Sequence, residues 1–167
     1  MTEPALRALA ACLTVLAYIA LCAGIYWGRC GQGESVAPRA AALAGTEPGT
    51  ATLVLFATQT GQAEALAWQT GRWLHDAGTP ARVMSLNDAD AELLRSTPRA
   101  LFIASTYGEG DAPDGASLFA ERVMGSVAEL SSLRYAVLAL GDRQYANFCR
   151  FGRLLDEWLH AAGAKRR

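Results

Sequence analysis

The sequence predicts an α/β fold in which a doubly wound parallel sheet carries helices on both faces. Short unbroken apolar runs alternate along the chain with segments of helical periodicity, an arrangement typical of parallel strands joined by right-handed crossover helices. In addition, the runs that begin at Leu53, Arg99 and Arg134 each end in glycine, hydroxyl and other polar residues. We therefore expect ligand-binding loops at the carboxyl edge of this sheet.

The N-terminal part of the 167-residue chain differs from the rest. Residues 8–27 contain no charged side chain and could span ~30 Å of hydrocarbon as a helix, so we predict one transmembrane helix there, preceded by a flank at residues 1–7. A cleaved signal peptide is the alternative, because a basic residue precedes the apolar run and small residues lie near its end. Residues 28–51, rich in Gly, Ala and Pro, predict a flexible linker to one domain at residues 52–167.

The domain is expected to consist of strands and helices in alternation. From their apolar runs, we predict strands at residues 53–57, 81–86, 99–105 and 134–140. From apolar residues that recur on one helical face, we predict helices at residues 63–77, 117–127 and 148–160, with a short helical or irregular segment at 87–95.

The first loop, which follows the strand at Leu53, has the composition of a phosphate-binding turn. Thr58 and Thr60 supply hydroxyls, Gly61 lets the backbone approach a ligand, and the next helix offers free N–H groups. No Lys or Arg lies between Leu53 and Gln69, which argues against a nucleoside triphosphatase and favours a terminal phosphomonoester. A capped helix N-terminus without a ligand is the alternative.

The second and third loops each carry a tyrosine shortly after a strand end, Tyr107 and Tyr145. Two aromatic side chains at one edge can enclose a flat conjugated ring, with stacking worth ~1 kcal/mol each. Either tyrosine alone would be read as a loop anchor. Together with a phosphate loop that lacks a cation, they predict a site for flavin mononucleotide (FMN).

Four acidic residues lie near this edge: Glu109, Asp111, Asp114 and Asp142. Negative charge beside a flavin would lower its reduction potential and attract a partner with a basic face. Solvated turn formation is the alternative role for these side chains, and the two roles are compatible.

Three segments, TQTGQAE, STYGEGDAPD and LGDRQYANFC, resemble the three flavin-binding loops of the flavodoxin-like domain in diflavin reductases, the family of the sulfite reductase flavoprotein and NADPH-cytochrome P450 reductase. The resemblance implies a flavodoxin-like fold with strand order 2-1-3-4-5 that binds FMN noncovalently. The family would begin a fifth strand near residue 163, where this chain shows no strand pattern, so we expect four strands and a missing fifth.

The resemblance also implies which residues bind the cofactor. In the first loop, the phosphate would be held by Thr58, Gln59, Thr60, Gly61, Gln62 and Ala63. One side of the ring would be bounded by Ser105, Thr106, Tyr107, Gly108, Glu109 and Gly110. The other side would be bounded by Leu140, Gly141, Asp142, Tyr145, Asn147 and Phe148.

These inferences predict a membrane-tethered FMN electron-transfer module, with its domain on the cytoplasmic side, where flavin is supplied. The expected electron donor is an NADPH/FAD reductase, and the expected acceptor is a haem or iron–sulfur protein. One alternative is a fragment of a membrane-anchored NADPH-dependent diflavin reductase. The other is a truncated domain that retains no flavin and acts only as an interaction module.

Other classes of function receive no support from the composition. A net charge of −1 without a basic stripe argues against nucleic-acid binding. The four cysteines show neither a C-x-x-C motif nor the spacing of metal ligands. No catalytic acid, base or nucleophile is expected because the flavin would carry the redox chemistry, and no nicotinamide-binding motif is evident.

Overall fold

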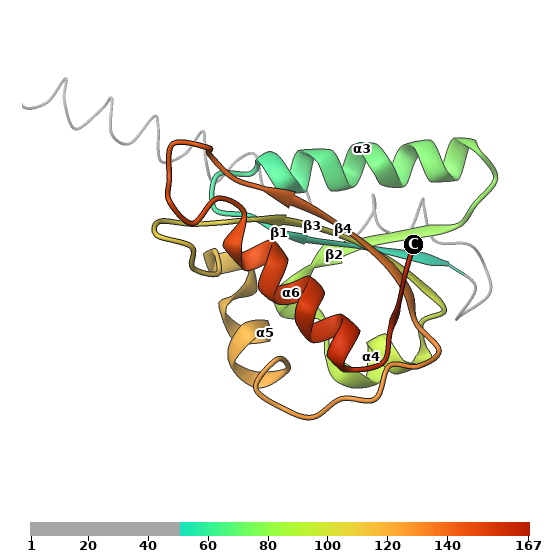
Figure 1. The fold of residues 1–167 in the computed structure, drawn as a ribbon. Helices are drawn as coiled ribbons and strands as arrows, with labels where there is room; N and C mark the ends of the chain where they lie inside the picture. Colours follow the sequence, from blue (N-terminus) through green and yellow to red (C-terminus); the bar gives the residue numbers. More distant parts are fainter. Residues whose placement is uncertain (1–50) are drawn as a thin grey trace, which may run out of the picture. The chain divides into compact units, whose positions relative to one another are not determined.

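The computed structural model describes residues 51–167, which form a five-stranded parallel sheet with helices on both faces (Figure 1). The strands are β1 (Thr52–Ala57), β2 (Ala81–Ser85), β3 (Arg99–Ser105), β4 (Arg134–Leu140) and β5 (Lys165–Arg166). Their order is β2-β1-β3-β4-β5, and every neighbouring pair is parallel. The predicted doubly wound sheet and its strand order are confirmed.

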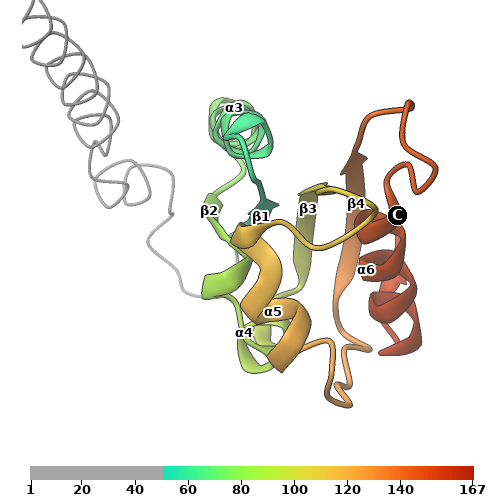
Figure 2. The same cartoon turned by 90° about the vertical axis from the view of Figure 1, so that its left-hand side faces the viewer.

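The helices divide unequally between the two faces. They are α3 (Gln62–Asp76), α4 (Ala91–Ser96), α5 (Ser117–Arg122) and α6 (Arg150–Ala161), with two 3₁₀ turns, η1 (Leu86–Asp88) and η2 (Asp114–Ala116). α3 lies on one face of the sheet, and α4, α5 and α6 lie on the other (Figures 1 and 2). α5 is shorter than the predicted helix at residues 117–127, and tight turns follow it around Gly125, a residue that disfavours helix.

The position of β1 inside the sheet explains the apolar run at Leu53–Ala57. All six residues of β1 are buried, because helices cover both faces of the sheet at this position. Leu53 and Leu55 contribute to the core beneath α5 and α6, whereas Val54 and Phe56 contribute to a second core beneath α3. In the larger core, the rings of Phe102 and Tyr135 meet edge to face with centroids 6.4 Å apart.

The expectation of a missing fifth strand is wrong. Lys165 and Arg166 pair in parallel with Arg134 and Tyr135 of β4, and the N–H of Arg167 donates to the carbonyl of Tyr135 at 2.9 Å. Two charged residues form no apolar pattern, so this strand depends on the backbone of β4 at the edge of the sheet rather than on its own side chains.

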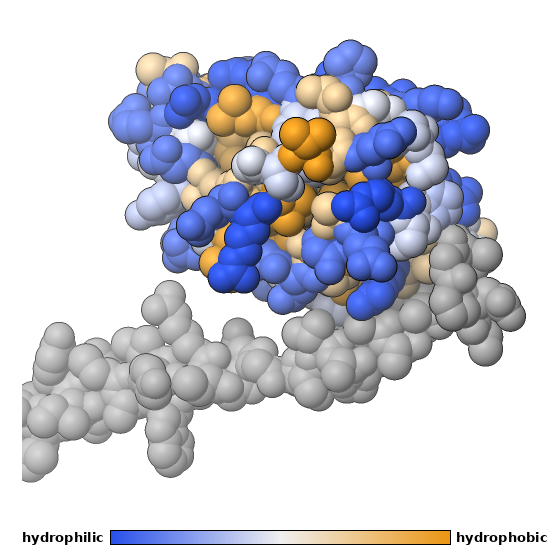
Figure 3. Space-filling view, turned by 90° about the horizontal axis from the view of Figure 1, so that it is seen from below, coloured by the Kyte–Doolittle hydropathy of each residue, from blue (hydrophilic) through white to orange (hydrophobic). Residues whose placement is uncertain are grey.

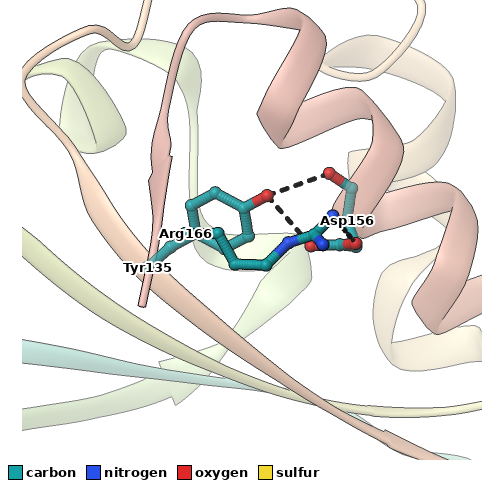
Figure 4. Close-up of polar contacts among 3 residues, drawn as sticks. All are labelled: Tyr135, Asp156 and Arg166. Atoms are coloured by element: carbon teal, nitrogen blue, oxygen red, sulfur yellow. Dashed lines mark hydrogen bonds and ion pairs between the residues drawn. The ribbon is translucent and has the colours of Figure 1, made fainter.

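A polar cluster joins β5 to α6 (Figure 4). The hydroxyl of Tyr135 donates to Oδ1 of Asp156 at 2.9 Å, and the guanidinium of Arg166 pairs with the other carboxylate oxygen of Asp156. Burial of the ring, together with the negative charge of Asp156, raises the pKa of the Tyr135 hydroxyl above its ordinary value. The cluster fixes the end of the chain against the last helix.

The two surfaces of the sheet differ in how fully they are covered. On the α3 side, α3 packs against β1, β2 and β3, and Leu138 of β4 is 50% exposed (Figure 2). Ala136 and Leu140 alternate with Leu138 on the same side of β4 and are half-buried. Figure 3 shows the opposite side, on which hydrophilic residues surround hydrophobic ones nearer the middle of the face.

Within residues 51–167, no helix is long and apolar enough to cross a membrane. The predicted transmembrane helix at residues 8–27, its flank and nearly all of the predicted linker lie outside the described residues.

Candidate functional site

The carboxyl ends of β1, β3 and β4 meet at one edge of the sheet, and the three predicted loops leave from there. Two adjoining hollows, together called the groove, lie between these loops, with volumes of about 690 Å³ and 330 Å³. The larger is lined by residues of all three loops, and the smaller by the second and third. Both volumes are within the range of small-molecule sites.

The first loop presents the N-terminus of α3 to the larger hollow. Gly61 is the N-cap of α3 in the left-handed conformation, with φ +90°, and no side chain caps the helix. The N–H of Gly61 donates to Oγ1 of Thr58 at 2.9 Å, which closes the turn. The N–H groups of the first helical turn therefore remain available to an anion, as predicted for this loop.

The two tyrosines, Tyr107 and Tyr145, both border the smaller hollow. Tyr107 is 53% exposed and Tyr145 is 50% exposed, and both line the smaller hollow together with Phe148. Each ring thus has free surface at the groove, which is what enclosing a flat conjugated ligand requires.

Glycines shape the second and third loops where side chains would collide. A Cβ on Gly110, at φ +117°, would lie 2.6 Å from Cδ of Arg150. A Cβ on Gly141 would lie 2.8 Å from the backbone nitrogen of Cys149. Gly110 lines neither hollow, so it serves the packing of its loop against α6.

Hydrogen bonds tie the three loops to one another. Nδ2 of Asn147, in the third loop, donates to the carbonyl of Glu109 in the second loop at 2.6 Å. The N–H of Thr106 donates to the carbonyl of Leu140 at 2.9 Å, and the side chain of Gln59 in the first loop bonds to Asp114. The site is therefore one connected assembly.

Most of the predicted site residues line the two hollows. They are Gln59, Thr60, Gln62, Ser105, Thr106, Tyr107, Gly108, Leu140, Gly141, Asp142, Tyr145, Asn147 and Phe148. The remaining predicted residues line neither hollow: Thr58, Gly61, Glu109 and Gly110, which belong to the loops, and Ala63, which is buried in the first turn of α3.

Three further residues line the hollows without having been predicted to bind the cofactor: Ala139, Arg143 and Cys149. Arg143 is the one cationic side chain among the lining residues, and its guanidinium carbon lies 5.9 Å from the centre of the Phe148 ring. Its position in the third loop, two residues before Tyr145, was the signal in the sequence that could have predicted that Arg143 lines the hollow. Cys149 is the buried N-cap of α6 and has a left-handed backbone conformation, which its sequence context does not reveal.

One buried polar atom tests whether a polar ligand fits this groove. Oγ1 of Thr106 is shielded from solvent and has no hydrogen-bond partner within the described residues, although Thr106 lines both hollows. An unpaired buried hydroxyl carries a free-energy cost that a ligand atom would relieve. The residues present fit FMN, because the start of α3 offers N–H groups to a phosphate and the tyrosines offer ring surface at the adjoining hollow.

Comparison with known proteins decides the family. The model of the flavodoxin family matches residues 54–167. The chain belongs to the flavodoxin family. The solved flavodoxin of Streptococcus pneumoniae TIGR4 is 28% identical, with a TM-score of 0.61, and the match covers 69% of this chain and 78% of that flavodoxin.

Sequence relatives are sulfite reductase [NADPH] flavoprotein alpha-components. The protein from Bacillus subtilis is 40% identical over 114 residues, which are 68% of this chain and 19% of the relative. That from a Neisseria meningitidis serogroup C strain is 38% identical over 146 residues, which are 86% of this chain and 24% of the relative. The resemblance to diflavin reductases is confirmed, and this flavodoxin domain corresponds to a quarter or less of the length of these relatives.

The family and its flavoprotein relatives support FMN as the cofactor, as predicted. The geometry agrees, because the groove joins an uncapped helix N-terminus to a hollow flanked by two exposed tyrosines.

Proposed function

We propose that this chain is an electron-transfer module that binds FMN in the groove between its three loops and is tethered to a membrane by residues 8–27. One observation carries the proposal. The uncapped N-terminus of α3 and the hollow flanked by Tyr107 and Tyr145 adjoin each other at the carboxyl edge of the sheet.

The chain's own residues would bind and orient the cofactor. The first turn of α3 would hold the phosphate, the tyrosines would flank the ring, and Thr106 would gain a hydrogen-bond partner. When bound, FMN supplies the redox chemistry, because its ring accepts and donates electrons.

The proposed donor is an NADPH/FAD reductase, and the proposed acceptor is a haem or iron–sulfur protein. Relatives named sulfite reductase [NADPH] flavoprotein support the proposal that this chain carries electrons between a reductase and an acceptor. Exposed Glu109, Asp111 and Asp142 beside the groove would favour partners with a basic face. We propose a single membrane span with the domain on the cytoplasmic side.

Titration of the full chain, purified in detergent, with FMN tests the proposal. We expect saturable quenching of flavin fluorescence with one FMN bound per chain, because stacking on tyrosine quenches the ring. The protein with Tyr107 and Tyr145 both replaced by alanine is the control, and we expect weaker binding and less quenching. Absence of saturable quenching at micromolar concentrations would contradict the proposal.

A second candidate is that the chain is a fragment of a membrane-anchored NADPH-dependent diflavin reductase. The matches favour it in one respect, because the chain corresponds to 19% and 24% of the length of two such relatives. Translation products larger than this chain, detected in the source cells with an antibody against residues 51–167, would support this candidate. A single product of the size of this chain would support the separate module.

A further inference from the structure

In the proposed site, phosphate binding by the first loop depends on the conformation of the loop backbone. No Lys or Arg lies between Leu53 and Gln69, so the loop itself offers a phosphate only polar uncharged side chains and backbone N–H groups. Such donors act only when the backbone directs them toward the ligand. Within the loop, the one hydrogen bond that fixes the backbone runs from the N–H of Gly61 to Oγ1 of Thr58. Further support must come from outside the loop.

That support comes from a residue 55 positions along the chain. Gln59 and Asp114 exchange two hydrogen bonds: Nε2 of Gln59 donates to Oδ2 of Asp114 at 2.8 Å, and the N–H of Asp114 donates to Oε1 of Gln59 at 2.9 Å. Beside them, the backbone of Gly115 lies close to the first loop, since a Cβ at position 115 would be 3.1 Å from both N and O of Thr58. The first and second loops therefore meet closely at this pair.

Asp114 is itself anchored to the rest of the domain. Nδ2 of Asn87 donates to the carbonyl of Asp114 at 2.7 Å, and Oδ1 of Asn87 accepts from the N–H groups of Leu118 and Phe119 in α5 at 3.0 and 3.2 Å. A chain of hydrogen bonds thus runs from α5 through Asn87 and Asp114 to Gln59. The first loop is held by the body of the domain through this chain.

We propose that Gln59 and Asp114 form a positioning pair that holds the first loop in its phosphate-binding conformation. The inference rests on the proposed function. Both the oxygen and the nitrogen of the Gln59 amide bond to Asp114, so the side chain acts through the loop rather than on the ligand. The ring lies at the other hollow, so loss of the pair acts on the phosphate end of the ligand.

The first test is a pair of single substitutions at Gln59. Gln59→Ala removes both hydrogen bonds without adding charge, and Gln59→Glu replaces the donor with an oxygen that faces the carboxylate of Asp114. We expect each to raise the dissociation constant for FMN about tenfold, equivalent to about 1.4 kcal/mol. Affinity for riboflavin is expected to change by less than about twofold, since it has no phosphate to lose.

The decisive test exchanges donor and acceptor. Adding Asp114→Asn to Gln59→Glu places a side-chain donor opposite the new carboxylate, so both hydrogen bonds can form again. We expect this double variant to recover FMN affinity to within about threefold of the wild type. Asp111→Asn in the Gln59→Glu background is the matched control, because it removes one negative charge from an exposed side chain of the same loop without restoring the pair.

Titrations with both flavins at low and at 0.5 M salt, with melting curves for each variant, separate the outcomes. Equal recovery by Asp111→Asn and Asp114→Asn would overturn the pair and leave only an effect of charge. An equal loss of affinity for FMN and riboflavin would overturn the link to the phosphate. If the wild type bound neither flavin, the proposed function itself would fail. The proposed role of the pair in phosphate binding would then fail as well.

Discussion

Tyr107 and Tyr145 carry half of their surface exposed at the groove, so each can lose contact with water when a ring stacks on it. We expect Tyr107→Ala and Tyr145→Ala each to raise the dissociation constant for FMN about fivefold, because stacking contributes ~1 kcal/mol per ring. Fluorescence titration measures the change. Trp73→Ala is the control, since Trp73 is 62% exposed on α3 and lines neither hollow. Unchanged affinity in both tyrosine variants would refute stacking.

Residues also differ in how far their roles follow from sequence. The pattern around Tyr107 and Tyr145 suffices to predict that both lie at one hollow, because each follows the end of one of two neighbouring strands. The partner of Gln59 could not be predicted, because Asp114 is 55 residues away and the contact depends on the path of the second loop. The unpaired hydroxyl of Thr106 likewise becomes visible only when its surroundings are packed.

Besides its backbone pairing with β4, β5 is held by the polar cluster of Tyr135, Asp156 and Arg166. The raised pKa of the Tyr135 hydroxyl means that the folded state favours the protonated form more than the unfolded state does. This contribution to stability is therefore complete below pH 10, the ordinary pKa, and is lost as pH rises through the raised value.

We accordingly expect the free energy of unfolding to fall as pH rises above about 10, and to fall less steeply in Tyr135→Phe. Denaturant titrations at a series of alkaline pH values measure the slope. Tyr107→Phe is the control, because Tyr107 is 53% exposed and lies outside the cluster at Asp156. An identical pH dependence for the wild type and Tyr135→Phe would count against the cluster at Asp156.

Elements were predictable where local pattern determines them. The strands at residues 99–105 and 134–140 have the bounds expected, because each is a short apolar run that ends at polar or glycine residues. β5 and the short α5 were not predictable. Lys165 and Arg166 pair only because β4 offers an edge, and residues beyond Arg122 leave the helix to form turns.

At the scale of the whole molecule, membrane attachment is the prediction that the described residues do not address. We expect the full chain to sediment with membranes and to resist extraction by alkaline carbonate, because residues 8–27 are uncharged over a bilayer-spanning length. Deleting residues 8–27 should release the protein without changing its affinity for FMN. Release of the intact chain by carbonate, or recovery of a product cleaved after the apolar run, would contradict a membrane anchor.

The strand order has a consequence for the amount of this protein in the cell. Because the loops of β1, β3 and β4 build the groove jointly, flavin binds only when the central strands and α6 are all in place. Ligand at about 100 times its dissociation constant would then stabilise the entire domain by about 2.7 kcal/mol. Chains made while flavin is scarce would unfold more often and meet proteases sooner, so the amount of this protein in a cell would follow the availability of its cofactor.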